Sequence, residues 1–491
     1  YGPWKMKKLS LLDLAFFVTE TKESPKHVAG LMIFKKPSRS PAGFVADLFE
    51  EFRSFDKPCA PFDQVINFVA LGGPGWRPVR SFDITQHVFY HKPKKALDNQ
   101  ALYDYVARLH TPLLDRSRPL WEFHIIDVVS DGRFAIYSKI HHAYADGVTL
   151  SSWTAQGLSA TSKDNKVKPV WAGLGGRKRR RPMGKATATS LLRKVVRGSL
   201  DQVRNAQGLA KLGTQLALEQ FGLTKNAVSL PFRSEGNTPL TGQVSADRQL
   251  AVARVSMEHV QRIRDMCRAT LNHVALTCVD GALHRFLKDS GGDLTRPIAI
   301  QMPVSLRSKG DAKGGNKIGF VTVDLAHRTD DPYERLREIG FTLRNVRNQI
   351  DGVRPDAIAQ YSIIMGVGAQ LTEMLRLNNV LPPISDTLVS NVPGPRDPLY
   401  LKGARMVEMC PVSTLMPGNR LNITLYSYAG TLHFGLIGTR ELGDLSLLAE
   451  YIEEAFDELD KAVFNPRTRP KTGSPRSRSA GRRAARRTGQ A

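Results

Sequence analysis

The chain has 491 residues, enough for two domains of ordinary size that each bury a core. Apolar residues make up 41% of the sequence, which is typical of globular proteins and excludes general disorder. The four cysteines form no CxxC pair, which argues for a reducing compartment and against a disulfide framework or a zinc knuckle.

The formal net charge of +24 is distributed very unevenly. Residues 161–200 hold twelve Lys and Arg against one Asp, a net +11, and residues 466–491 hold nine Lys and Arg and no acid, a net +9. The rest of the chain is close to balanced. This pattern indicates two basic appendages that contact an anionic surface, and lipid is favoured because no nucleic-acid recognition motif accompanies them. No nucleic-acid partner is therefore expected.

The sequence predicts neither secretion nor a membrane span. No apolar run reaches the roughly 18 residues that a spanning helix needs. No long apolar segment follows Met6-Lys7-Lys8, as it would in a signal peptide. We therefore expect a cytoplasmic protein without a transmembrane helix.

The first half of the chain alternates strand-like and helix-like segments. Hydrophobic periodicity predicts strands at 27–34, 121–128 and 134–140 and helices at 42–55 and 101–109. This mixture favours an α/β sandwich whose sheet carries functional residues at its edge.

The third of these strands leads directly into the heptapeptide HHAYADG at residues 141–147. Histidine suits general acid–base catalysis because its pKa is near neutral. Adjacent residues of an extended segment point to opposite sides, so one of His141 and His142 faces a cavity while the other packs. Asp146 would brace the turn, and Gly147 would leave space beside the reacting atoms. A structural histidine pair and a metal site remain alternatives, although no third His or Cys stands at ligand spacing nearby.

A basic segment separates the two halves. Residues 162–182 are rich in Lys, Arg, Gly and Pro and read as an exposed connection. Beyond it, apolar residues at helical spacing with basic residues around them predict one long or broken amphipathic helix at about 188–221. This helix either lies on a membrane or packs across both halves as a crossover helix.

The second half repeats the α/β mixture. The pattern predicts helices at 257–268, 272–288, 331–350 and 445–464, strands at 298–304 and 388–391, and an antiparallel pair at 421–427 and 432–437. Asp444 is placed to cap the last helix. Asn272 is either the N-cap of its helix or a side-chain amide aimed at the reaction centre.

The heptapeptide has the HHxxxDG pattern of the CoA-dependent acyltransferase superfamily, and the chain resembles the bacterial wax ester synthase/acyl-CoA:diacylglycerol acyltransferases. The resemblance covers nearly the whole chain. It is carried, in order, by LSLLD (9–13), PKHVAG (25–30), RPLWE (118–122), LNHV (271–274), MPVSLR (302–307) and SNVPGP (390–395). HHxxxDG alone leaves several families open, whereas the ordered set with its spacing is specific.

The resemblance implies two chloramphenicol-acetyltransferase-like α/β sandwich halves with the active site at their interface, joined by a basic linker and crossover helix. The expected divisions are an N-terminal acyltransferase half (1–160), the linker and crossover helix (161–235), a C-terminal acyltransferase half (236–465) and a disordered basic tail (466–491).

The resemblance also implies an activity: transfer of a long-chain fatty acyl group from acyl-CoA to a long-chain alcohol, giving a wax ester, or to diacylglycerol, giving triacylglycerol. Acyl-CoA is a substrate, so no cofactor is expected. The alcohol would attack directly, because the sequence holds no GxSxG elbow and no Cys–His constellation. Peripheral association with an anionic membrane or with lipid inclusions is expected, and the oligomeric state stays open.

The same resemblance assigns residue roles in the heptapeptide. His142 would be the general base, supported by His141. Asp146 would hold the turn by pairing with an arginine, for which Arg118 and Arg307 are both candidates. Gly147 completes the motif.

Outside the heptapeptide, Asn272 would donate a hydrogen bond to the tetrahedral oxyanion. Members of the family often carry Asn-Asp here, whereas this chain has Asn272-His273, so a role is transferred only to the asparagine. The expected substrate-binding residues are Pro119, Leu120, Trp121, Gly315, Asn316, Ser390 and Asn391. Trp121 has a second reading, as an ordinary core residue.

Two other functions compete with this one. A condensation enzyme that forms amides from carrier-bound acyl groups shares HHxxxDG, but this chain has no carrier domain and does have the lipid-synthase motifs. A non-catalytic basic protein that binds lipid surfaces or nucleic acid would use the histidines only structurally.

Overall fold

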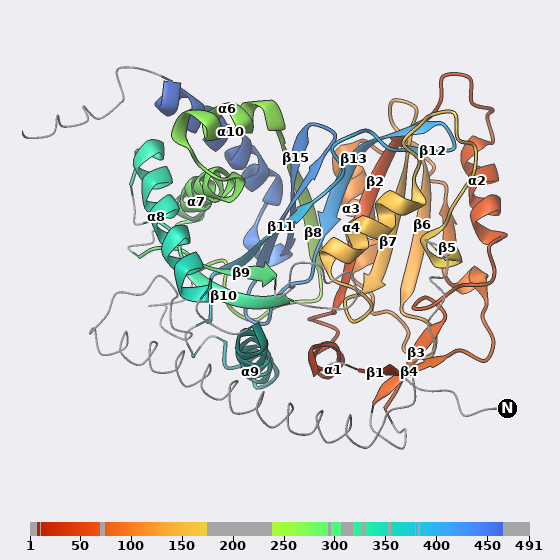
Figure 1. The fold of residues 1–491 in the computed structure, drawn as a ribbon, viewed down its shortest axis with the longest axis horizontal. Coiled ribbons are helices and arrows are strands. Elements are labelled where there is room, and N and C mark those ends of the chain that lie inside the picture. The colour runs from red at the N-terminus through yellow and green to blue at the C-terminus, as the bar shows by residue number, and fades with distance from the viewer. Residues whose placement is uncertain are drawn as a thin grey trace, which may run out of the picture.

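The computed structural model describes residues 7–464 except residue 10, 69–73, 174–237, 293–295, 306–317, 327–328, 352–354, 379 and 382. Two six-stranded sheets stand side by side, each with helices on its outer side, and a small three-stranded sheet lies beneath the first (Figure 1). The predicted α/β class is confirmed. The amphipathic helix predicted at 188–221, the linker before it and the basic tail lie outside the described residues.

The first sheet holds the heptapeptide at the end of a central strand. Its strands, in spatial order, are β12 (Tyr400–Leu401), β13 (Ala404–Val412), β2 (His27–Lys35), β7 (Arg133–His141), β6 (Trp121–Val129) and β5 (Val88–His91). The helices of this half are α1 (Leu11–Val18), α2 (Phe44–Arg53), α3 (Asn99–His110) and α4 (Gly147–Gly157). Both faces of β7 are covered, because apolar side chains of α2 pack on one and those of α3 on the other. A strand buried on both faces reads as the continuous apolar run seen in the sequence.

Two strands of the first sheet come from the second half of the sequence. β13 pairs antiparallel with β2, and β12 extends the sheet beyond it. The boundary predicted at residue 236 therefore divides the chain but not the sheets. The domain limits themselves stay a prediction.

The second sheet contains β10 (Ile318–Asp324), β9 (Ala299–Ser305), β11 (Thr387–Pro393), β14 (Leu421–Tyr428), β15 (Thr431–Thr439) and β8 (Arg248–Ser256), in that order. Its helices are α6 (Met257–Cys267), α7 (Leu271–Asp289), α8 (Pro332–Asp351), α9 (Pro355–Met374) and α10 (Leu445–Phe464). The hairpin predicted at 421–437 is confirmed, with Tyr428 paired to Thr431 across the turn. The predicted cap of α10 is also confirmed, since the Asp444 carboxylate accepts a hydrogen bond from the Ser446 amide at 2.9 Å.

The small sheet consists of β1 (Lys7–Lys8), β4 (Gly75–Pro78) and β3 (Gln64–Asn67). In Figure 1 it lies at the same end of the molecule as α1 and α9, which are neighbours although they come from opposite halves. β7 points its C-terminal end, and so the two histidines, toward this end of the molecule.

Candidate active site

A cavity of about 290 Å³ lies where the two sheets meet. His142, Asp146 and Gly147 line it from the first half, and Ser390 and Asn391 of β11 line it from the second. Most of the remaining wall is apolar, with side chains from β2, β7, α4 and the end of β13. A mostly apolar cavity with a few convergent polar groups is the usual form of a site for an apolar small molecule.

Backbone hydrogen bonds fix the turn that carries the two histidines. The His141 amide donates to the Leu120 carbonyl at 3.0 Å, and the His142 amide donates to the Lys26 carbonyl at 2.8 Å. The Tyr144 amide then donates to the His141 carbonyl at 3.0 Å, which closes the turn. The backbone of each histidine is thus held by a neighbouring strand end.

His142 is the histidine that lines the cavity. Its imidazole is half-buried and stacks on the Phe16 ring with the centroids 4.6 Å apart. Burial lowers the pKa of His142 below its ordinary value, while a hydrogen bond to its own backbone carbonyl and the Asp146 carboxylate oppose that shift. The ring is therefore neutral at neutral pH and able to accept a proton.

His141 is fully buried and stacks on the Phe17 ring with the centroids 4.4 Å apart. Its Nδ1 accepts a hydrogen bond from the Ala143 amide at 3.1 Å, so the ring proton belongs on Nε2. That Nε2 lies 3.5 Å from the Glu20 carboxylate. His141 is thus enclosed and oriented, and it does not line the cavity.

Glu20 is a charged anchor of this turn that sequence reasoning missed. Burial raises its pKa, but His141, the Lys26 amide and Arg116 outweigh burial and lower the pKa to about 2. The Lys26 amide donates to its Oε1 at 2.9 Å and Arg116 to its Oε2 at 3.0 Å. No sequence signal could have found Glu20, because it lies in a loop far from the heptapeptide.

Asp146 and Gly147 hold the start of α4. Asp146 is its N-cap, and its carboxylate accepts a hydrogen bond from the Thr149 amide at 2.9 Å. A Cβ at Gly147 would lie 3.0 Å from the Val392 side chain, so the glycine permits the close approach of β11. Arg118 is not the expected arginine partner of Asp146, since it pairs with Asp115 at 3.6 Å.

The other candidate for that pairing, Arg307, lies outside the described residues, as do the predicted substrate-binding residues Gly315 and Asn316. The interaction expected between Asp146 and Arg307 therefore stays a prediction.

Two asparagines from distant parts of the second half form a pair beside the cavity. Asn391 lines the cavity, and its Nδ2 donates to Oδ1 of Asn272 at 2.7 Å. Ser390, its neighbour on β11, shares a hydrogen bond of 2.9 Å with the Thr424 hydroxyl. Of the pair, Asn391 lines the cavity and Asn272 does not. Asn272 can therefore affect a bound molecule only by orienting the Asn391 amide.

Of the two alternatives for Asn272, the helix N-cap is wrong. Thr270 is the N-cap of α7, with its hydroxyl accepting from the His273 amide at 3.2 Å. Nδ1 of His273 accepts in return from the Thr270 amide at 3.4 Å, which completes a capping box. His273 thus does here the reciprocal capping that an acidic residue does elsewhere, and Asn272 is left free of the cap to contact Asn391.

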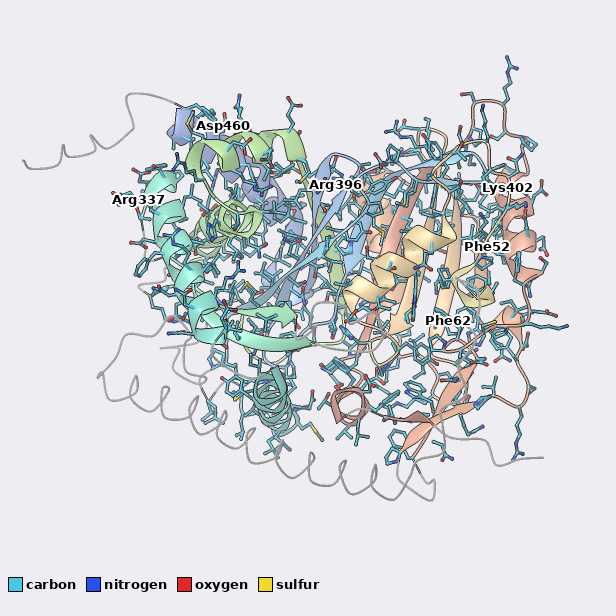
Figure 2. All side chains as sticks on the ribbon, in the orientation of Figure 1. Phe52, Phe62, Arg337, Arg396, Lys402 and Asp460 are labelled. Atoms are coloured by element: carbon cyan, nitrogen blue, oxygen red, sulfur yellow. The ribbon has the colours of Figure 1, made fainter. Side chains whose placement is uncertain are left out.

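Trp121 is a core residue and does not line a tunnel. It is fully buried and stacks on Trp171 and His87 with centroids 5.0 and 4.3 Å away. Its Nε1 donates to the carbonyl of Phe62 at 2.9 Å, and Figure 2 labels Phe62 near the lower end of the first sheet. Pro119 and Leu120, which precede it, are also not among the residues lining the cavity.

Within the described ranges, no group of three or more His, Cys, Asp or Glu is arranged to hold a metal ion. None of the helices in those ranges is long and apolar enough to cross a bilayer.

The sequence matches known families along most of its length. The profile of the wax ester synthase/diacylglycerol acyltransferase catalytic domain matches residues 9–275, and that of the WS/DGAT C-terminal domain matches residues 314–460. A Mycobacterium tuberculosis protein named for diacylglycerol O-acyltransferase activity is 34% identical over 465 residues, which are 93% of this chain and 100% of that protein. O-acyltransferase WSD of Acinetobacter baylyi is 30% identical over 453 residues, 91% of this chain and 96% of that protein.

Solved structures agree with the sequence matches. The wax ester synthase/diacylglycerol acyltransferase of Marinobacter aquaeolei VT8 superposes with a TM-score of 0.71 at 25% identity, covering 93% of this chain and 100% of that one. The first condensation domain of the calcium-dependent antibiotic synthetase superposes with a TM-score of 0.60 at 13% identity, covering 94% and 97%. The second likeness shows the fold alone, and it confirms the expected acyltransferase-like pair of halves.

Proposed function

The chain belongs to the wax ester synthase/diacylglycerol acyltransferase family, and we propose that His142 is the general base of its O-acyl transfer. The enzyme moves a fatty acyl group from acyl-CoA to a long-chain alcohol or a diacylglycerol. One observation carries the role of His142: of the two histidines, it alone lines the apolar cavity, while His141 is enclosed against Glu20.

The reaction needs one proton to move twice. His142 takes the proton of the acceptor hydroxyl as its oxygen attacks the thioester carbonyl. When the tetrahedral intermediate collapses, the carbon–sulfur bond breaks and the imidazolium returns the proton to the thiolate of CoA. The stacked Phe16 ring and the backbone bonds of the turn hold the imidazole in one orientation throughout.

The oxyanion of the intermediate needs a donor, and the amide pair of Asn272 and Asn391 supplies one. One N–H of Asn391 is used by Asn272, which leaves its second N–H for the cavity. Asn272 then orients the amide that faces the substrate. This support comes from the opposite half to the base, so both reacting partners would be held between the halves.

The test is acceptor-dependent thiol release from palmitoyl-CoA, with lipid products resolved, for the wild type and His142→Ala. Hexadecanol and a diacylglycerol serve as acceptors. We expect release to disappear in the variant while its thermal unfolding midpoint stays close to that of the wild type. Equal release from both proteins would mean that the heptapeptide is structural.

The pH profile of the same reaction gives a second readout. A base must be neutral to act, so the rate falls as the pH drops through the pKa of His142. Burial lowers that pKa below the ordinary 6.5, so we expect the midpoint of the acidic limb below pH 6.5. A midpoint above 6.5 would contradict the assignment.

We also propose that the enzyme works at an anionic lipid surface. The end of α9 and the residues after it expose large apolar side chains, Leu371, Met374, Leu375, Val380 and Leu381. α9, which carries Leu371 and Met374 and leads into the other three, contacts α1. Each of the two helices contributes to the cavity wall, through Gly366 and Phe16. An exposed apolar rim beside a cavity for lipids, in a chain of net charge +24, supports peripheral contact with anionic lipid.

Sedimentation with vesicles that contain anionic phospholipid tests this contact. The double variant Leu375→Glu/Val380→Glu should bind more weakly than the wild type. Met266→Glu is the matched control, because Met266 is also exposed but lies on α6, at the other end of the molecule from α9 (Figure 1). Equal binding by all three proteins would show that the exposed apolar side chains at the end of α9 do not contact the lipid.

A further inference from the structure

Lys26 lies directly across from His142. β2 and β7 are antiparallel with His27 opposite His141, and the hydrogen bond from the His142 amide to the Lys26 carbonyl continues this register by one residue. Residues opposed on antiparallel strands project from the same face, with Cβ atoms about 4.5–5.5 Å apart. Both side chains accordingly line the cavity.

The Lys26 ammonium is buried and has few hydrogen-bond acceptors within reach among the described residues. Only 4% of the residue is exposed, and Nζ donates to the Ser24 hydroxyl at 2.6 Å. No ion pair joins Lys26 to a carboxylate within the part of the chain that the structure describes. An ammonium has three N–H donors, so two of them have no partner among the described residues.

Two carboxylates keep this ammonium charged without using its donors. Burial lowers the pKa of Lys26 to about 8, and attraction to Glu20 and Glu373 limits the shift, so the group is protonated at neutral pH. Glu20 already accepts from the Lys26 amide and Arg116, and Glu373 accepts from the Val244 amide at 3.0 Å. Leaving a buried charged donor unpaired is costly, so an oxygen ligand is expected there.

Neighbouring polar groups on the cavity wall do not fill this need. The Thr414 hydroxyl donates to the Pro25 carbonyl at 2.8 Å, and the Asn422 amide donates to the Thr414 carbonyl at 2.7 Å. Thr414 and Asn422 line the same cavity but are committed to protein partners. The two unpaired N–H donors of Lys26 are therefore available to hydrogen-bond a ligand in the cavity.

We propose that Lys26 binds the ester carbonyl oxygen of a diacylglycerol acceptor and thereby favours diacylglycerol over unbranched alcohols. The inference rests on the proposed function and names a substrate-recognition residue for the same site. When the free hydroxyl of a diacylglycerol with neighbouring ester lies at His142, only the glycerol carbons and the ester oxygen separate it from that carbonyl. Lys26 and His142 line the same cavity from opposed positions of two neighbouring strand ends, so one acceptor molecule can contact both side chains. A fatty alcohol presents only methylene groups at the same place, which cannot pair with an ammonium.

The experiment compares kcat/KM for 1,2-dipalmitoylglycerol and for hexadecanol with palmitoyl-CoA as donor, and follows the ratio of the two values. In Lys26→Met the ratio should fall by roughly tenfold to a hundredfold, as expected for loss of a hydrogen bond to a charged donor. Lys26→Arg keeps a cation with several N–H groups and should recover part of the ratio.

Lys139→Met is the matched control. Lys139 is buried to a similar extent, at 1% exposed, but its Nζ donates to the carbonyls of Leu109 at 3.0 Å and Pro112 at 2.5 Å and it is not among the residues lining the cavity. Its loss should lower the thermal unfolding midpoint and leave the ratio of the two acceptors unchanged.

An equal fall for both acceptors in Lys26→Met would overturn the proposal, because Lys26 would then act on the oxyanion or on the strand ends. An unchanged ratio would overturn it as well. If Lys26→Met does not fold, Lys26→Gln gives the same comparison with a neutral donor, for which the ratio should fall less. Failure of the wild type to acylate either acceptor would instead refute the proposed function.

Discussion

The two sides of the cavity are braced in opposite ways. On the first half, His141 faces the ionised Glu20, which is also held by Arg116. On the second half, Asn272 and Asn391 hold each other through neutral amides. The Glu20 carboxylate orients His141, which does not line the cavity, whereas the pair that faces the cavity from the second half consists of neutral amides. An anion placed there would oppose the negative charge that develops on the thioester oxygen.

The two sides also differ in how far apart their residues lie in the chain. The heptapeptide is one continuous turn at the end of β7, whereas Asn272 and Asn391 are 119 residues apart and meet only because β11 ends beside the first turn of α7. The base is thus positioned mainly by local backbone geometry, and the amide pair by long-range packing.

Among variants that leave the base His142 in place, the largest effect should come from breaking the amide pair. Asn391→Ala removes the amide that lines the cavity, and Asn272→Ala removes the group that orients it. Each should lower kcat by about two orders of magnitude, which corresponds to about 3 kcal/mol. Because the two amides act through one hydrogen bond, the double variant should be little worse than either single variant.

Losses that simply add in the double variant would mean that the two asparagines have separate roles. Asn419→Ala is the matched control: Asn419 is buried and donates to the Ser385 carbonyl at 2.6 Å, away from the cavity. It should lower the free energy of unfolding and leave kcat close to that of the wild type.

A smaller effect on activity, within about tenfold, is expected from Glu20→Gln, because the variant perturbs His141 and not the base itself. Its main readout is stability. The pKa of Glu20 lies near 2 in the folded protein against an ordinary 4.5, so the ionised carboxylate stabilises the fold above pH 4.5, and this contribution disappears as the pH falls toward 2. The difference in free energy of unfolding between the wild type and the variant should be roughly 2–3 kcal/mol at neutral pH and should shrink below pH 4.5.

The control for Glu20 is Glu51→Gln. Glu51 pairs with Lys402, which Figure 2 labels at the outer edge of the first half, and both side chains are about 30% exposed. A surface pair of this kind contributes little, so its loss should change the free energy of unfolding by less than about 1 kcal/mol. A pH-independent difference for Glu20→Gln would show that Glu20 is not ionised in the fold.

Local patterns were a good guide where a segment is buried or capped by its own neighbours. The strand at 134–140, the helix at 445–464 with its Asp444 cap and the hairpin at 421–437 follow directly from periodicity and turn residues. The same holds for the base: a strand that ends in two histidines must turn one of them toward each side.

Prediction failed where the deciding partner is distant. α1 and α9 were not predicted, because they are apolar around most of their circumference and lack the two-sided pattern of a surface helix. For Asn272 the sequence left the helix N-cap and a functional amide as alternatives; Thr270 and His273 make the cap together, and the distant partner Asn391 could not be foreseen. Trp121 had both a substrate-binding and a core reading, and stacking on Trp171 decides for the core.

The amino-acid sequence alone was sufficient to identify the family, the α/β class and the histidine turn. These features depend on short motifs and on local periodicity, and both can be read from residues that are neighbours in the chain. Which histidine meets the cavity, the ionised Glu20 behind the other, the pairing of Asn272 with Asn391 and the place of Lys26 across from His142 were decided by the tertiary structure. Each of these depends on strand register or on contacts between residues far apart in the chain. Local hydrophobic periodicity predicts neither of them.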